Sequence, residues 1–209
     1  GVGPVARETR EICAAAARRF EDLGAVVEEA CPDLSDATEI FMALRGVQFA
    51  VDRAPLIETE RARIKPDVIW NTELGLKLGG ADIAAAERKR AALYGRVLEF
   101  FQTHDLLVCP CRPVPAFDVN LRHPQTIDGQ KPATYISGSA LTYAVTLTSC
   151  PAICVPCGFT EDGRAVGLQI VGRPRGEAAL LGAAALFEQL SGLDRLLPID
   201  PRPGTVPPE

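Results

Sequence analysis

Apolar residues recur every three to four positions through the first part of the chain, a spacing typical of helices with one buried face. One helix is predicted from Pro4 to Gly24, because glycine commonly ends helices. Its apolar face comprises Ile12, Ala16, Phe20 and Leu23. We expect the valine-containing segment 25–29 behind this helix to form a short strand.

The same spacing continues to residue 100 and predicts further helices. Ser35 is the expected N-cap of one of them, since serine favours that position. Its apolar stripe comprises Ile40, Leu44, Val47 and Val51. Pro55 and Pro66 are predicted to divide this region into separate helices, because proline disrupts a helix interior. Asp82 is the expected cap of a long helix that reaches Phe100.

The pattern changes after residue 105. Residues 106–109 form a continuous apolar run that ends at a proline, which favours a strand covered on both faces. Residues 111–132 contain four prolines and predict a long irregular loop, a kind of segment that often carries function. Residues 139–149 are apolar enough for a buried helix.

A β-hairpin is predicted from residues 152–159 and 165–172, because the spacer between them contains an Asp-Gly pair. A last helix is expected over residues 177–190. The sequence therefore predicts an α/β fold in which helices cover a mixed sheet. We expect residues 1–196 to belong to one domain and residues 197–209 to form a proline-rich tail.

Charge and composition exclude several function classes. The net charge is −5 and the longest basic cluster is Arg88-Lys89-Arg90, so we expect no nucleic-acid partner. No apolar run reaches the roughly 18 residues of a membrane span, so we expect no membrane partner. The seven cysteines are an odd number scattered over the chain, which favours reduced thiols and a cytoplasmic location.

Three cysteines raise the possibility of a metal cluster. Cys150, Cys154 and Cys157 have the CxxxCxxC spacing of three-thiolate iron–sulfur loops. The surrounding residues are apolar and strand-like, a context that favours buried thiols acting as small hydrophobic side chains. Zinc is disfavoured as well, because His104 and His123 are the only histidines. We therefore predict no metal and no cofactor.

No catalytic residue is predicted within the chain. A serine nucleophile needs a base within hydrogen-bond reach, and the sequence has no GxSxG motif. The segment Ser137-Gly138-Ser139 resembles part of an oxyanion-hole loop but is better interpreted as a helix start. The four lysines (Lys65, Lys77, Lys89 and Lys131) all lie in predicted helices or loops, where burial would not lower the pKa of an amine.

Residues 104–190 resemble the C-terminal hallmarks of the amidase-signature family, which includes bacterial amidases and the A subunit of glutamyl-tRNA amidotransferase. The segments that carry the resemblance are HDLLVCP at 104–110, Leu141-Thr142, SCPAICVPCG at 149–158 and DGRAVGLQIVG at 162–172, followed by Arg173 and Glu177. Residues 1–36 also resemble the helix–strand unit behind the family's catalytic core. The resemblance implies that the chain is the C-terminal part of the amidase-signature fold.

The resemblance implies the family's mechanism, which is acyl transfer by a serine nucleophile with a bridging serine and a lysine base. In the family all three lie in the N-terminal half, so the resemblance implies that they precede Gly1. The first residue is Gly1 rather than Met, which predicts a cut or processed product. The substrate implied is a small carboxylic amide. The chain departs from the family at Thr146, often Asn, and at Ser149, often Gly. The A subunits of amidotransferases often have Asp where this chain has Ser139, which favours a stand-alone amidase over a tRNA-dependent enzyme.

Substrate contacts are expected where strands end, as in other open α/β sheets. The predicted substrate-binding residues are Cys111, Tyr135, Thr142 and Thr146. A packing or capping role for Tyr135 and Thr142 is the alternative. A non-catalytic pseudoenzyme or interaction module is the rival function. Few strands are predicted for so many helices, so we expect open edges and self-association, for example as a homodimer.

Overall fold

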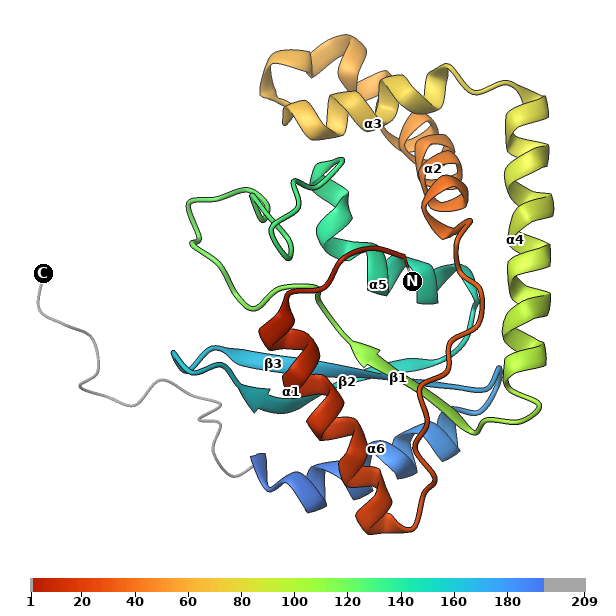
Figure 1. Ribbon diagram of the computed structural model, residues 1–209. Coiled ribbons are helices and arrows are strands. Elements are labelled where there is room, and N and C mark those ends of the chain that lie inside the picture. The colour runs from red at the N-terminus through yellow and green to blue at the C-terminus, as the bar shows by residue number, and fades with distance from the viewer. Residues whose placement is uncertain (1, 194–209) are drawn as a thin grey trace, which may run out of the picture.

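The computed structural model describes residues 2–193, in which a small sheet has helices on both faces (Figure 1). Its three strands are β1 (Leu106–Pro110), β2 (Ala152–Phe159) and β3 (Ala165–Gly172). Their order is β1-β3-β2 and both pairings are antiparallel. The sheet therefore places β1 beside β3, the second strand of the hairpin.

The hairpin has the bounds that the sequence predicts. Its turn contains Gly163 with φ of 86°, a left-handed conformation that glycine adopts without strain. The backbone amide of Arg164 donates to the Thr160 hydroxyl at 2.8 Å, and this hydroxyl also donates to the Asp162 carboxylate. These contacts satisfy the polar groups of the turn and fix the register of the two strands.

The first helical segment comprises α1 (Arg7–Arg18) and a 3-10 turn (Arg19–Leu23), and it ends at Gly24 as predicted. The strand expected at residues 25–29 is wrong, since this segment is extended but joins no ladder. Strand propensity needs a neighbouring strand to pair with, and the Glu28 side chain instead contacts His104 at 2.8 Å.

Helix α2 (Ala37–Glu60) continues through Pro55, so the predicted break there is wrong. Pro55 is exposed, and the carbonyl that loses its N–H donor can bind water on that side of the helix. The break at Pro66 is confirmed, because this residue opens α3 (Pro66–Leu76) at a position where the missing N–H costs nothing. The N-cap of α2 is Asp36 rather than Ser35, whose amide donates to Asp33 instead.

Helix α4 (Gly80–Phe100) begins two residues before the cap predicted from the sequence. Its N-cap is Gly79, and Asp82 stands inside the first turn, where its carboxylate accepts from the Gly79 amide at 2.9 Å. Asp82 therefore stabilises the helix start as the N3 residue of a capping box, whose side chain accepts from the N-cap amide, and not as the N-cap itself.

The remaining helices follow the long loop, which has no regular element between residues 111 and 134 apart from one isolated bridge. A 3-10 turn (Tyr135–Ser139) leads into α5 (Ala140–Leu147), which the sequence predicts as a buried helix. Helix α6 (Glu177–Ser191) completes the described fold. The predicted tail, residues 197–209, lies outside the described residues.

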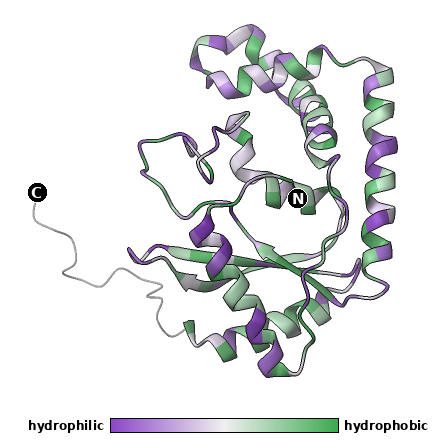
Figure 2. Cartoon of the chain, in the orientation of Figure 1, coloured by the Kyte–Doolittle hydropathy of each residue, from purple (hydrophilic) through white to green (hydrophobic). Residues whose placement is uncertain are grey.

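Two apolar cores hold these layers together. On one face of the sheet, α1 and α6 pack against Leu168 and Ile170, and Phe20 stacks on Phe187 with ring centroids 5.2 Å apart. On the other face, Val171 joins a core built with α2, α4 and α5. Figure 2 shows hydrophobic strands with more polar residues on the outer helix faces. None of the helices within residues 2–193 combines the length and hydropathy that crossing a bilayer requires.

Candidate functional site

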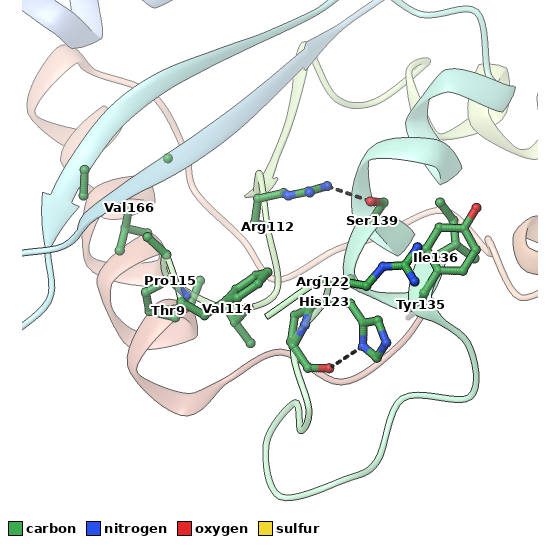
Figure 3. A pocket seen from close by; sticks show the side chains of 16 residues that line it. Thr9, Arg112, Val114, Pro115, Arg122, His123, Tyr135, Ile136, Ser139 and Val166 are labelled. Atoms are coloured by element: carbon green, nitrogen blue, oxygen red, sulfur yellow. Dashed lines mark hydrogen bonds between the residues drawn. The ribbon is translucent and has the colours of Figure 1, made fainter. Parts of the chain in front are cut away.

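A cavity of about 400 Å³ lies between the start of α1, the loop after β1 and the turn before α5 (Figure 3). Its polar lining comes from Thr9, Arg112, Arg122, His123, Tyr135 and Ser139. Its apolar lining includes Val114, Phe117, Ile136 and Val166. The volume suits a small molecule, and the mixture of apolar walls with a few polar groups is typical of ligand pockets.

Three basic side chains reach this cavity from the long loop. Arg112 directs its guanidinium toward the turn before α5, where its Nη1 donates to the Ser139 hydroxyl at 2.7 Å (Figure 3). Arg122 forms an ion pair with Asp67 at the start of α3. The His123 Nδ1 lies 3.2 Å from the Pro124 carbonyl oxygen, so this nitrogen carries a proton and donates.

Tyr135 is the predicted substrate-binding residue that directly lines the cavity. Its hydroxyl accepts from the Asn71 side chain at 2.6 Å and from Arg45 at 3.1 Å. The Arg45 guanidinium also lies 4.3 Å from the Phe49 ring centroid, so aromatic packing holds it in place. The ring of Tyr135 is thus fixed by α2 and α3 at the edge of the cavity.

The other predicted site residues lie around the cavity rather than on its wall. Cys111 is a neighbour of the lining residue Gly167. A side chain at position 167 would place its Cβ 3.5 Å from the Cys111 Cβ. Thr142 donates its hydroxyl to the Ser139 carbonyl at 2.9 Å, and Thr146 is exposed and donates to the Thr142 carbonyl at 3.0 Å. The structure brings Cys111 and Tyr135 to this region and places the two threonine hydroxyls along α5.

The cavity arginines and His123 are functional candidates that the sequence predictions missed. Arg112, Arg122 and His123 lie in the long proline-containing loop. The prediction that this loop carries function pointed to the segment, but periodicity cannot locate side chains in irregular backbone. The sequence feature that could have identified these three residues is the occurrence of basic side chains between the prolines of this loop.

The CxxxCxxC cysteines do not converge. Cys157 faces α1, where its sulfur lies 3.8 Å from the Cys13 sulfur, whereas the Cys154 sulfur lies beside Gly167 on the other face of the sheet. Residues 2–193 contain no group of three potential ligands able to hold a metal ion. The alternation of side chains along β2 separates these thiols, which argues against an iron–sulfur cluster.

Cys111 and Cys154 meet across the middle strand because Gly167 has no side chain. A Cβ at Gly167 would lie 2.6 Å from the Cys154 sulfur. A hydrogen bond from Cys154 stabilises the Cys111 thiolate, Arg112 adds a favourable charge, and together they lower the pKa of Cys111 to about 6. Burial raises the pKa of Cys109 to about 11. Of Cys109 and Cys111, we therefore expect Cys111 to be the more reactive thiol.

We expect iodoacetamide to modify Cys111 at neutral pH while Cys109 stays unmodified. The thiolate is the reactive form, so Cys111 modification should fall as the pH drops through about 6. Peptide mass mapping of the folded protein across a pH series measures this. Cys154→Ala removes the hydrogen bond and should move the midpoint upward. Equal modification rates for Cys111 and Cys109 would contradict the assignment.

The Amidase family profile matches residues 4–181, and the chain belongs to this family. An acylamidase of Rhodococcus erythropolis is 32% identical over 190 residues, which cover 90% of this chain and 40% of the acylamidase. The A subunit of a glutamyl-tRNA(Gln) amidotransferase from Syntrophomonas wolfei is 31% identical, over 88% of this chain and 42% of that protein. The chain thus spans about two fifths of these relatives.

Solved structures show the same fold. A bacterial aryl acylamidase of the amidase-signature family superposes with a TM-score of 0.80 at 23% identity, over 93% of this chain and 42% of that protein. A 6-aminohexanoate cyclic dimer hydrolase complexed with substrate gives a TM-score of 0.77 at 21% identity, over 91% and 43%. The family and the α/β fold class predicted from the sequence are confirmed.

Proposed function

We propose that this chain is the C-terminal portion of an amide hydrolase that cleaves a small carboxylic amide by Ser–Ser–Lys acyl transfer. In this proposal the catalytic residues come from a segment that precedes Gly1. One observation carries it: the chain belongs to the amidase family and spans about two fifths of its relatives. Related amide hydrolases support C–N bond cleavage as the reaction class.

The polar contacts within the chain support an upstream location for the nucleophile and base. Among residues 2–193, no lysine donates to a serine; the Lys89 amine, for example, donates to Glu39. The Ser139 hydroxyl accepts from Arg112, and the Ser137 hydroxyl accepts from the Thr134 amide at 3.2 Å. A serine needs an adjacent base for activation, and these contacts provide none.

The chain's own contribution in this proposal is a wall of the substrate pocket. We assign the wall itself to Tyr135, with the cavity beside it as the binding volume, and we propose Cys111, Thr142 and Thr146, which lie around the cavity, as further substrate-contacting residues. Hydrogen bonds from Asn71 and Arg45 to the Tyr135 hydroxyl support a preorganised wall. The cytoplasmic location remains a prediction.

The direct test uses the longer protein, meaning residues 1–209 preceded by the segment encoded upstream of Gly1. Its incubation with aliphatic, aromatic and amino-acid amides, including glutamine, should release ammonia from a subset of them. Release from none of them would favour the non-catalytic module. Release from glutamine alone, stimulated by partner proteins, would favour a role in a tRNA-dependent amidotransferase, the class to which several relatives of this chain belong.

We propose that residues 1–209 alone self-associate. Strand β2 pairs only with β3 among the described residues, so its outer edge is free to bind another strand. Large apolar side chains are also exposed, including Val51, Trp70 and Leu76. Light scattering over a dilution series should show a mass above 22.3 kDa that falls on dilution. A monomer at all concentrations, without dye binding, would contradict this expectation.

A further inference from the structure

Two arginines line the cavity in a chain whose net charge is negative. Arg112 and Arg122 contribute to its wall, and among residues 2–193 no aspartate or glutamate lines the cavity. The whole chain has a net charge of −5. In a concave site, an arginine whose charge is not already paired attracts ligands of the opposite sign.

Of the two cavity arginines, Arg112 is the one for which the described part of the chain provides no carboxylate partner. Within residues 2–193 no acidic oxygen lies within 4.0 Å of its nitrogens, whereas Arg122 is neutralised by Asp67. Among residues 2–193, the acceptor for the Arg112 side chain is the neutral Ser139 hydroxyl, 2.7 Å from its Nη1. A guanidinium has five N–H donors, so most of its hydrogen-bonding capacity is free for a ligand.

The backbone on both sides of Arg112 is held in place. The Cys111 amide donates to the Gly167 carbonyl at 2.9 Å, which ties the loop to β3. The Pro113 carbonyl accepts from the Ala6 amide at 2.8 Å, which ties the loop to the start of α1. The hydrogen bond to Ser139 also directs the exposed guanidinium before a ligand arrives, which reduces the side-chain entropy that binding would cost.

We propose that Arg112 recognises a carboxylate on the substrate, so that the substrate class is a small amide with a second, anionic group. The inference rests on the proposed amide-hydrolase function and names its substrate class. The planar guanidinium matches a carboxylate through two parallel hydrogen bonds. Apolar walls from Val114, Phe117 and Ile136 suit a methylene spacer between the carboxylate and the amide.

The test compares glutaramate, an amide with a carboxylate, and the neutral pentanamide as substrates of the longer protein. The wild type should prefer glutaramate in kcat/KM. Arg112→Gln should reduce this preference roughly 10- to 100-fold, the range expected for hydrogen bonds to a charged group. Ser139→Asp should have a similar effect, because the new carboxylate occupies the guanidinium. The matched control Arg53→Gln removes an exposed charge on α2 and should leave the preference unchanged.

A preference for glutaramate that survives Arg112→Gln, or no preference in the wild type, overturns the inference while the amidase function stands. If the longer protein hydrolyses no amide, the proposed function fails, and calorimetric titration with glutarate then tests the arginine site separately. Binding that Arg112→Gln abolishes, and Arg53→Gln retains, supports the site. No glutarate binding by the wild type overturns it.

Discussion

Replacing Gly75 with alanine is expected to force α2 and α3 apart and to destabilise the protein strongly. The two helices approach each other at Gly46 and Gly75, which are both buried. A Cβ at Gly75 would lie 1.8 Å from the Gly46 carbonyl oxygen and 2.4 Å from its carbonyl carbon. These are backbone atoms, so rotation of a side chain cannot relieve the clash. We expect a loss of roughly 3 kcal/mol in the free energy of unfolding, near the upper end of overpacking costs.

Gly95→Ala is the matched control for this substitution. Gly95 lies within α4, and a Cβ there would have no atom within 4 Å. Alanine should therefore stabilise the helix by up to about 1 kcal/mol through its higher propensity. Urea unfolding of the longer protein measures both variants. Equal stability of Gly75→Ala and the wild type would show that the helices do not meet as described.

Residues 1–209 alone are expected to hydrolyse no amide at a rate above buffer. The serine hydroxyls beside the cavity bind Arg112 and the loop backbone, so none of them is activated as a nucleophile. Ammonia release from an amide panel, with the longer protein at equal concentration as the positive control, measures this. Turnover by residues 1–209 that a substitution within this segment abolishes would reveal an active site of its own.

Local patterns in the sequence predicted the hairpin and most helices, because these elements depend on short-range periodicity and turn chemistry. The bounds of β2 and β3 follow from strand-like runs on either side of the Asp162-Gly163 turn. The errors arose where tertiary context decides. Residues 25–29 have strand propensity but no partner strand, and Pro55 is tolerated because it is exposed. The Gly46–Gly75 contact joins two helices and has no signature in either segment alone.

For the candidate site, too, local sequence patterns predicted some features and tertiary contacts decide the others. Family membership could be predicted from the motifs in residues 104–190, and the comparisons confirm it. Tyr135 was predicted near the site, but its fixation by Arg45 and Asn71 joins residues distant in sequence. The pairing of Arg112 with Ser139 likewise depends on how an irregular loop returns to α5. Loop geometry of this kind leaves no periodic signal in the sequence.

The most direct test of the central claim is to trap the covalent intermediate of the longer protein during turnover of a reactive anilide. Acid quenching followed by peptide mass mapping identifies the acylated residue. The proposed mechanism predicts an acyl group on a serine that precedes Gly1. Acylation inside residues 1–209, above all on Cys111 with its lowered pKa, would contradict the Ser–Ser–Lys assignment and place the nucleophile in this chain.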